Sequence, residues 1–576
     1  MFKGKILSKN KIKLCLIIIT AIVLSGSLGN ISGMGNAFAE TSGNNVIING
    51  TQFKDTSGNI IHAHGGGFLK YGDYYYWYGE YRDQSNLFKG VRCYRSKDLV
   101  NWEYRGEVLS PDSHPELNRV NIERPKVMYN QFTKEFVMWM HWENGIHYGE
   151  ARAAVAYCST PDGKYTYKGS FRPYQNSGVE DHGRPGYMSR DCTVFVDTDG
   201  KGYFLSSSNE NMDLHLYELT PDYKDIASLA AKLYVGKQRE APCLFKRNGY
   251  YYLVTSGCTG WDPNQAKYAY SKDLRSGWSE LYNLGNSTTY RSQPTYVLPV
   301  QGTSGTSYLY AGDRWAGAWG GRVNESQYVW LPLVFLSDTK LVLPYYDAIE
   351  INVQAGTITE YMPDKTRYKI VNRHSGKVLD VKDSSTDNAA PIVQWSDNDS
   401  LSQQWYIVDV GNGYKKIVNA KTGFALDVKD ESKDNGGLLI QYTSTGGHNQ
   451  HWEFIDIGNG YYKIKSRGSG KLLDVYKWST DDGATVQQWS DANGENQHWK
   501  LVKVEDTPQY IIGDITGDGI IDSNDCVLLQ RYILDIIDSF PNSNWQIVAD
   551  INKDGIINTL DYALLSRHIL EIQSIT

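Results

Sequence analysis

Between residues 72 and 315, short apolar and aromatic runs recur, and each follows a turn. The runs are GDYYYWYGEY (72–81), KEFVMWMHWE (134–143), GKGYFLSSSNE (200–210), NGYYYLVTSG (248–257) and TSYLYAGDRW (306–315). Their starts lie roughly 50 to 65 residues apart, and glycines punctuate many short strands with little helical period. Five such units predict a five-bladed β-propeller over residues 43–362, with an irregular β-sandwich as the alternative.

A second pattern, over residues 366–504, is an internal threefold repeat. The strings KVLDVKD, FALDVKD and KLLDVYK place aspartates at 380, 427 and 474, which are 47 residues apart. The same spacing relates two further sets: Trp395, Tyr442 and Trp489, and Trp405, Trp452 and Trp499. In each repeat the aspartate can accept hydrogen bonds from vicinal hydroxyls, and the first aromatic can stack on a pyranose. The second tryptophan, in QQW or QHW, is expected in the core at the pseudo-threefold axis.

This repeat resembles the ricin-type β-trefoil of carbohydrate-binding module family 13 over its whole length. The resemblance implies the sugar-binding residues Asp380, Trp395, Asp427, Tyr442, Asn449, Gln450, Asp474, Trp489, Asn496 and Gln497. The first repeat has Ser402-Gln403 where the other two have Asn-Gln, so we expect an altered first site. A trefoil without working sites is the alternative.

The third pattern is a pair of acidic loops, DITGDGIIDSND at 514 and DINKDGIINTLD at 550. A twelve-residue calcium loop needs oxygen ligands at positions 1, 3, 5, 9 and 12, a carbonyl at 7 and glycine at 6. Both loops fit, with Gly519 and Gly555 at the turn. The implied ligands are Asp514, Thr516, Asp518, Ile520, Asp522 and Asp525, then Asp550, Asn552, Asp554, Ile556, Asn558 and Asp561.

Each loop is followed by one apolar-periodic helix, CVLLQRYIL or YALLSRHIL. Aspartate at position 12 and a single helix per loop resemble a type I dockerin over residues 511–573. The resemblance implies two Ca²⁺ ions and docking onto a cohesin of a scaffold protein, as in cellulosomes. Departures from the common Ser-Thr and Lys-Arg pairs at Ser523-Asn524 and Gln530-Arg531 leave the particular cohesin open.

The N-terminal segment and the composition predict a secreted protein. Lysines, the apolar run LCLIIITAIVLSG and Ala37-Phe38-Ala39 predict a secretory signal over residues 1–39; a membrane anchor is the alternative. Aromatic residues make up 13% of the chain, with 43 Tyr and 16 Trp, which suits strands and sugar-stacking surfaces. A net charge of −7 with mixed signs excludes a basic nucleic-acid surface. Of the seven cysteines, the six that follow the predicted signal form no CxxC pattern and are expected to be mostly buried free thiols.

Glycoside hydrolysis requires a protonated carboxyl for the leaving group and usually a second carboxylate. Two acidic residues are candidates for these roles. SRDCTVFVDTDGKGYF (189–204) presents Asp191 just before a strand, and QREAPCLFKRNGYYYLVTSG (238–257) presents Glu240 just before another. These strings resemble glycoside hydrolase family 43, whose members are five-bladed, inverting enzymes. The resemblance implies Glu240 as general acid and Asp191 as the group that raises its pKa and orients it.

The stretch IHAHGGGFLKYGDYYYWYGEY (61–81) departs from that family. Its Ala63-His64-Gly65-Gly66 stands where most members have an Ala-Asp-Pro-Ser-like string carrying the base. A metal site at His62 and His64 lacks an evident third ligand, and a phosphate loop lacks GK[ST] and a helix. The glycines are expected to admit substrate to the backbone or to be structural.

Because it lacks this aspartate, the sequence resembles the exo-β-1,3-galactanase subgroup of family 43, which lacks it as well. In YRSQPTYVLPV, Gln293 takes the position of a candidate base acting as an imidic acid; in NIERPKVMYN, Glu123 holds the terminal galactose or is itself the base. Tyr148, Thr259 and Trp261 are expected to contact substrate. We therefore expect a secreted, inverting exo-β-1,3-galactanase. The alternatives are an arabinofuranosidase, arabinanase or xylosidase of the same family, and a non-catalytic galactan-binding lectin.

Overall fold

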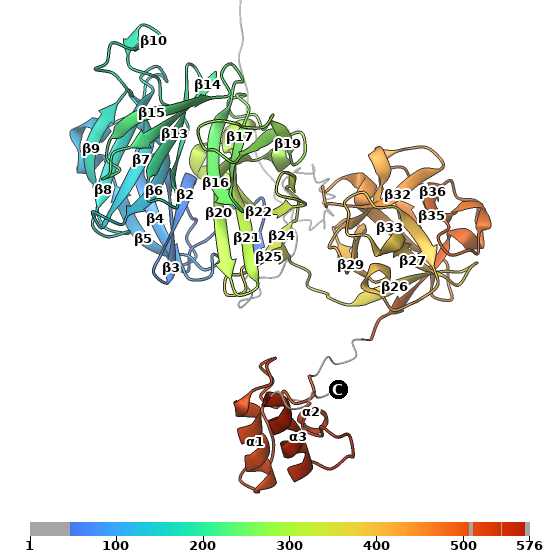
Figure 1. The fold of residues 1–576 in the computed structure, drawn as a ribbon. Helices are drawn as coiled ribbons and strands as arrows, with labels where there is room; N and C mark the ends of the chain where they lie inside the picture. Colours follow the sequence, from blue (N-terminus) through green and yellow to red (C-terminus); the bar gives the residue numbers. More distant parts are fainter. Residues whose placement is uncertain (1–45, 506–510, 543, 571–576) are drawn as a thin grey trace, which may run out of the picture. The chain divides into compact units, whose positions relative to one another are not determined.

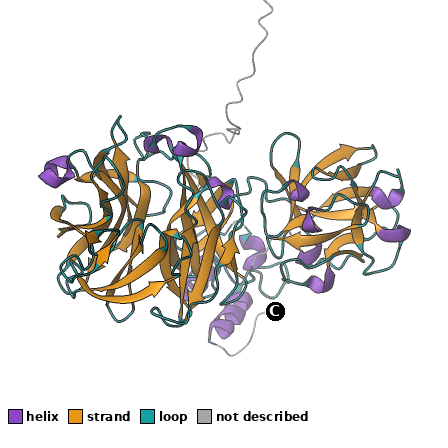
Figure 2. Cartoon of the chain, turned by 90° about the horizontal axis from the view of Figure 1, so that it is seen from above, coloured by secondary structure: helices purple, strands orange, loops and turns teal. Residues whose placement is uncertain are grey.

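The computed structural model describes residues 46–505, 511–542 and 544–570. The predicted signal at 1–39 lies outside these residues. No helix in the described part of the chain is long and apolar enough to cross a bilayer. In the described residues α-helix is confined to the C-terminal segment, whereas the propeller and the trefoil consist of strands, loops and short 3-10 helices, the latter purple in Figure 2.

Five four-stranded antiparallel sheets form the blades of a propeller (Figure 1). Blades one to three are β2 (His64–Tyr71), β3 (Tyr74–Arg82), β4 (Phe88–Ser96) and β5 (Glu103–Leu109); β6 (Asn121–Asn130), β7 (Glu135–Glu143), β8 (Arg152–Cys158) and β9 (Thr166–Phe171); and β12 (Cys192–Val196), β13 (Gly202–Ser208), β14 (Asp213–Leu219) and β15 (Ile226–Leu233). Blades four and five are β16 (Glu240–Arg247), β17 (Tyr250–Ser256), β18 (Ala266–Ser271) and β19 (Tyr282–Leu284); and β20 (Gln293–Gly302), β21 (Gly305–Arg314), β22 (Gln327–Phe335) and β23 (Leu341–Val342).

The recurring aromatic runs of the sequence form the second strand of each blade: β3, β7, β13, β17 and β21. These strands are paired on both sides and nearly all of their residues are buried, so large apolar and aromatic side chains suit both faces. The first strands β2, β6, β12, β16 and β20 contact one another in turn, and β20 contacts β2 again. They therefore form the innermost ring, and their starts define one end of the axis.

The propeller is fastened by residues from both ends of its sequence. β1 (Val46–Ile48) pairs with β24 (Ala348–Asn352), which pairs with β25 (Thr357–Glu360). Thr51 forms a further bridge with Tyr328 on β22. A small ladder of β10 (Glu180–Asp181) and β11 (Arg184–Pro185) lies in the long connection before blade three.

Twelve strands form the threefold segment, which is a β-trefoil. They are β26 (Arg367–Asn372), β27 (Val378–Val381), β28 (Ile392–Trp395), β29 (Trp405–Asp409), β30 (Lys415–Asn419), β31 (Ala425–Val428), β32 (Gly437–Tyr442), β33 (His451–Asp456), β34 (Tyr461–Ser466), β35 (Leu472–Val475), β36 (Val486–Trp489) and β37 (His498–Lys503). Trp405, Trp452 and Trp499 are completely buried in one core cluster. The prediction that these tryptophans form the core is confirmed.

The C-terminal segment contains α1 (Ser523–Ile533), α2 (Trp545–Val548) and α3 (Thr559–Ile569). Asp522 and Asn558 cap α1 and α3, each accepting a hydrogen bond from the backbone N–H two residues on. The helices pack through Leu529 and Leu565, both fully buried. Position 9 of each acidic loop is thus also the residue that starts the helix.

All six cysteines in the described residues are free. Cys93, Cys192 and Cys243 are buried, Cys158 and Cys526 are partly exposed, and Cys258 is exposed. Three of these six thiols are buried, fewer than the mostly buried set that the sequence led us to expect.

Candidate active site

A pocket of about 290 Å³ opens where the innermost strands begin. It lies at the lower end of the size range of small-ligand sites. Its lining is dominated by charged and aromatic side chains: Glu80, Arg82, Glu123, Arg124, His141, Tyr148, Arg190, Asp191, Asn211, Glu240, Gly260, Trp261, Gln293 and Trp315. The four predicted catalytic residues are therefore brought together in one cavity.

Glu240 is the first residue of β16, and its carboxyl is mostly buried. Its Oε1 accepts a hydrogen bond from Gln293 Nε2 at 2.9 Å, and its Oε2 accepts one from Asn211 Nδ2 at 3.2 Å. Burial, and then the negative charge of Asp191, raise the pKa of Glu240 to about 8. Glu240 is thus protonated at neutral pH, which is the state that a general acid needs.

Asp191 immediately precedes β12 and is fixed on both sides. Its Oδ2 accepts a hydrogen bond from the backbone N–H of Ala241 at 3.0 Å and lies 3.0 Å from the guanidinium of Arg124. Ala241 directly follows Glu240, so the bond ties the two carboxyl-bearing strand starts together. A carboxylate held in this way imposes its charge on Glu240 and also positions it.

Gln293, the first residue of β20, has its amide orientation fixed by four partners. Its Oε1 accepts hydrogen bonds from Arg124 and from Trp315 Nε1, the latter at 2.7 Å. Its Nε2 donates to Glu240 and, at 2.9 Å, to Ser256 Oγ. The structure places Gln293 directly beside the acid.

Glu123 lies near the start of β6, among donors. Its carboxylate forms ion pairs with Arg82 at 2.7 Å and with His141 at 3.2 Å. It also accepts a hydrogen bond from the Tyr148 hydroxyl at 2.6 Å. Burial alone raises a carboxyl pKa, but the hydrogen bond from His141 and the charge of Arg82 outweigh it and hold the pKa of Glu123 well below its usual range. Glu123 is therefore a persistent anion.

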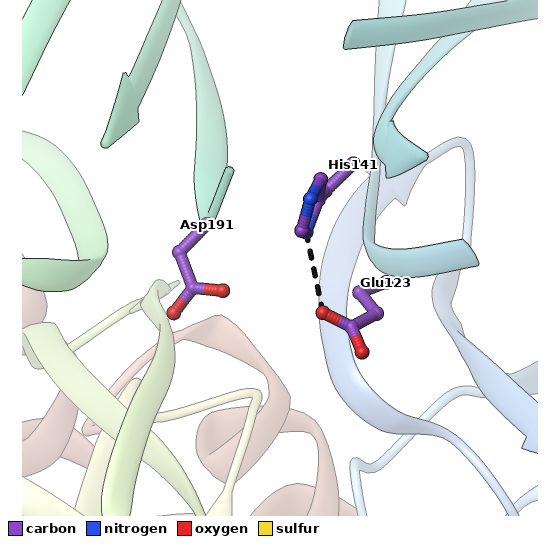
Figure 3. Close-up of side chains that lie close together, drawn as sticks. All are labelled: Glu123, His141 and Asp191. Carbon is purple, nitrogen blue, oxygen red and sulfur yellow. Dashed lines mark ion pairs between the residues drawn. The ribbon is translucent and has the colours of Figure 1, made fainter. Parts of the chain in front are cut away.

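His141 lies on β7 between two carboxylates, Glu123 and Glu143, the latter 3.0 Å away. Burial opposes its charge, but hydrogen bonds to both carboxylates raise the pKa of His141 to about 9. Figure 3 shows the His141 ring paired with Glu123 while Asp191 approaches from the facing strand. Glu123, His141 and Asp191 lie close enough to share an ion. However, the imidazolium and the guanidinium groups of Arg82 and Arg124 already compensate these carboxylates, so the donor set does not favour a metal.

Glu80, on β3, is a pocket residue that the sequence reasoning missed. Its Oε2 accepts two hydrogen bonds from Arg82, at 2.8 and 2.6 Å. Burial raises the pKa of Glu80, against the opposing charge of Arg82. The available signal was the glutamate that follows the aromatic stretch YYYWYG within GDYYYWYGEY.

His62 and His64 do not converge on a metal. The Nδ1 atom of His64 lies 3.0 Å from Asp313 Oδ1, and its ring stacks on Tyr328. His62 instead stacks on Tyr81. The glycines are largely structural, because a Cβ on Gly66 would lie 2.1 Å from the carbonyl oxygen of Tyr78.

Of the three residues that we expected to contact substrate, two line the pocket and one does not. Tyr148 and Trp261 line the pocket. The Thr259 side chain donates to the Asp262 carbonyl at 2.5 Å and accepts from Asn264, beside the lining residue Gly260. Sequence reasoning also missed several lining residues: Arg82, Arg124, His141, Arg190, Asn211 and Trp315. The available signal was adjacency, because Arg124 directly follows Glu123 and Arg190 directly precedes Asp191.

The trefoil repeats share a buried aspartate beneath an exposed aromatic. Trp395, Tyr442 and Trp489 are 37–39% exposed, whereas Asp380, Asp427 and Asp474 are buried. Asn449 and Gln450 both donate to Asp427 Oδ2, and Asn496 and Gln497 both donate to Asp474 Oδ2. In the first repeat Gln403 alone makes this bond, and Asp380 Oδ1 is buried without a partner.

Both acidic loops fit a calcium ion by their donors. Gly519 and Gly555 have φ of 86° and 82°, the left-handed backbone that position 6 requires. Each first aspartate accepts the N–H of that glycine, Asp514 at 3.0 Å and Asp550 at 2.8 Å. The predicted oxygen ligands are carboxylates, two amides, one hydroxyl and two carbonyls, the hard donors that calcium prefers.

A five-bladed propeller with a buried, protonated carboxyl and a second carboxylate in an axial pocket defines the catalytic segment as a glycoside hydrolase. Three family models match the chain: glycosyl hydrolases family 43 over residues 67–315, the ricin-type β-trefoil lectin domain over 357–442 and 448–524, and the dockerin type I domain over 512–570. Type I dockerins are calcium-binding modules that dock onto cohesins.

Solved structures give the same result. An exo-β-1,3-galactanase from Clostridium thermocellum is 79% identical over 80% of this chain and all of that chain, with a TM-score of 0.79. An exo-β-1,3-galactanase from Phanerochaete chrysosporium is 28% identical over 80% of this chain and 93% of its own, with a TM-score of 0.50. The chain belongs to glycoside hydrolase family 43.

A curated xylan 1,3-β-xylosidase from a Vibrio species is 25% identical over 186 residues. The match spans 29% of this chain and 32% of that protein.

Proposed function

We propose that this protein is a secreted, scaffold-docked exo-β-1,3-galactanase that releases galactose from the ends of β-1,3-galactan backbones with inversion. The observation that carries the proposal is Glu240, a carboxyl kept protonated by burial and by Asp191 in a pocket of about 290 Å³. A small pocket suits a chain end better than the middle of a polymer. Similarity to two exo-β-1,3-galactanases supplies the substrate.

In this proposal Glu240 donates its proton to the oxygen that leaves with the shortened galactan. Asp191 keeps Glu240 protonated until that step and orients it through the N–H of Ala241. Glu123, which is anionic and rigidly held, accepts hydrogen bonds from hydroxyl groups of the terminal galactose. Gln293 fixes the orientation of the acid through its hydrogen bond to Glu240.

The trefoil and the dockerin place this chemistry on its substrate. We propose that the second and third trefoil repeats bind galactan, because an Asn and a Gln side chain position each of their aspartates below an exposed aromatic. Two Ca²⁺ ions, one in each acidic loop, would be held by the carboxylates of Asp514, Asp525, Asp550 and Asp561 together with the other loop oxygens. The positive charge of each ion would hold the oxygen ligands of its loop together.

The test is product analysis. The full mature chain is incubated with β-1,3-galactan, β-1,4-galactan, arabinan and xylan, with Glu240→Gln as the matched inactive control. We expect galactose from the β-1,3 polymer alone and none from the variant. Pentose release would move the protein to the arabinanase or xylosidase class, and binding without release from any polymer would indicate a lectin.

A further inference from the structure

The innermost strands of blades one, two and four begin in the same way. His64, Glu123 and Glu240 each precede a residue with a left-handed backbone: Gly65 with φ of 60°, Arg124 with 56° and Ala241 with 52°. Each pair is followed by a register shift in the ladder to the second strand. Such bulges aim side chains at a chosen point. His64 is therefore the structural counterpart of Glu123 and Glu240, although it carries no carboxyl.

In blade one the carboxylate stands one strand further out. The ladder places Glu80 of β3 directly opposite His64 of β2. His64 itself is fully buried, pairs with Asp313 and is absent from the pocket lining, whereas Glu80 lines the pocket. The first blade thus offers a carboxylate to the cavity from its second strand.

Gly65 makes room for this carboxylate. A Cβ built on Gly65 would lie 2.5 Å from Glu80 Oε1, closer than two such atoms can approach. The two hydrogen bonds that Arg82 donates to Glu80 both go to Oε2. Oε1 is therefore the oxygen that faces the start of the inner strand at Gly65.

The position of blade one in the ring suits a base. An inverting pair of carboxyl groups is separated by about 6.5–9.5 Å, with the sugar and a water between them. Glu240 is in blade four, whose neighbours in the ring are blades three and five. Gln293 of blade five contacts Glu240 at 2.9 Å, which leaves no space for sugar and water. Blades one and two, which carry Glu80 and Glu123, lie across the ring.

Glu80 and Glu123 differ in the direction in which their surroundings shift the carboxyl pKa. Glu123 is bound by Arg82, His141 and Tyr148, and its pKa is lowered. Glu80 has Arg82 as its cationic partner, and burial raises its pKa. A general base works best when its pKa approaches the working pH, so Glu80 is better suited to accept a proton and Glu123 to remain an anion under the sugar hydroxyls.

We infer that Glu80 is the general base of the hydrolysis, in place of the aspartate missing at His64; this inference rests on the proposed function. As the oxygen of water bonds to C1 of the terminal galactose, Glu80 accepts one water proton. The bond from C1 to the glycosidic oxygen breaks, and that oxygen takes the proton of Glu240. One water is consumed, one galactose is released, and the two carboxyl groups exchange their protons with solvent.

The test uses Glu80→Gln and Glu80→Ala in the full chain, with β-1,3-galactobiose as substrate. We expect kcat to fall by about 10²–10⁴-fold with a small change in KM, the usual size of a general-base effect. Azide needs no deprotonation, so azide should restore turnover of Glu80→Ala and yield α-galactosyl azide by NMR. Glu107→Gln, a carboxylate paired with Arg92 in the same blade outside the pocket, is the matched control and should keep wild-type kinetics.

Glu123→Ala and Gln293→Ala are measured in the same way. Azide rescue of either variant, or wild-type kcat in folded Glu80→Gln, would overturn the assignment of Glu80. If Glu80→Gln fails to fold, judged by circular dichroism, the azide product of Glu80→Ala and the kinetics of Glu80→Asp decide. Inactive wild-type enzyme on galactobiose would instead refute the proposed function, so the two failures are distinguishable.

Discussion

Glu240 owes its protonated state to burial and to the negative charge of Asp191 beside it. Because the acid must be protonated, activity should fall as pH rises through the pKa of Glu240, near 8 in the free enzyme. The alkaline limb of the kcat/KM profile reports this group. The residue-scale claim can therefore be tested by removing one charge.

Asp191→Asn should move the alkaline limb of kcat/KM to lower pH by about one pH unit or more, because a neighbouring like charge no longer opposes ionisation of Glu240. The maximal rate should also fall, since the acid loses its positioning contact. The measurement is a pH profile of galactobiose hydrolysis. Asp197→Asn, which removes a carboxylate paired with Lys246 at the far end of β12, should leave the limb in place. An unchanged limb in Asp191→Asn would contradict the assignment.

The sequence indicated Asp191, Glu240, Glu123 and Gln293 because each lies at a strand start, within a recognisable string. Glu80 and His141 were not found, because they face the pocket only through ladder register, opposite His64 and Glu123. A two-residue bulge decides which second-strand residue reaches the axis, and sequence patterns do not fix bulges. The roles of all six residues remain proposals until variants are measured.

At the scale of elements, the trefoil repeats differ in one side chain that supports the binding aspartate. Asn449 and Asn496 donate to the aspartates of repeats two and three, while Ser402 occupies this position in repeat one. The unpartnered Asp380 Oδ1 gives the altered first repeat a structural basis. We therefore predict that the first repeat binds sugar differently from the other two.

Asn449→Ser and Asn496→Ser should each weaken galactan binding roughly fivefold at the affected repeat, since one hydrogen bond contributes about 1 kcal/mol. Ser402→Ala, the corresponding change in the first repeat, should leave binding unchanged. Binding is measured by calorimetry in the Glu240→Gln background, so that the ligand is not hydrolysed. Equal losses in all three variants would show that the first repeat binds as well as the others.

The dockerin module was predictable because a calcium loop is a local motif, whose glycine and expected oxygen ligands lie within twelve positions; the individual ligands stay predictions. The propeller was predictable from its recurring second strands, but not the assignment of side chains to faces. In the loops the ligand at position 12 also forms structure: Asp525 and Asp561 accept backbone N–H groups and are fully buried.

At the scale of the whole molecule, catalysis, sugar binding and docking belong to separate segments. Chelating calcium from the full chain should increase amide hydrogen exchange in α1 and α3 and abolish cohesin binding, because metal binding and folding are coupled in such loops. Galactose release should persist, and added Ca²⁺ should restore protection. Loss of hydrolysis on chelation would reveal a functional metal in the propeller.

The central claim, an inverting exo-β-1,3-galactanase, is tested most directly by following the first product by NMR. The full mature chain is added to linear β-1,3-galactan, and the anomeric protons are recorded before mutarotation. The account predicts free galactose from the earliest time points, appearing as the α-anomer, with no larger oligosaccharides. Initial release of β-galactose, or of oligosaccharides in place of galactose, would contradict it.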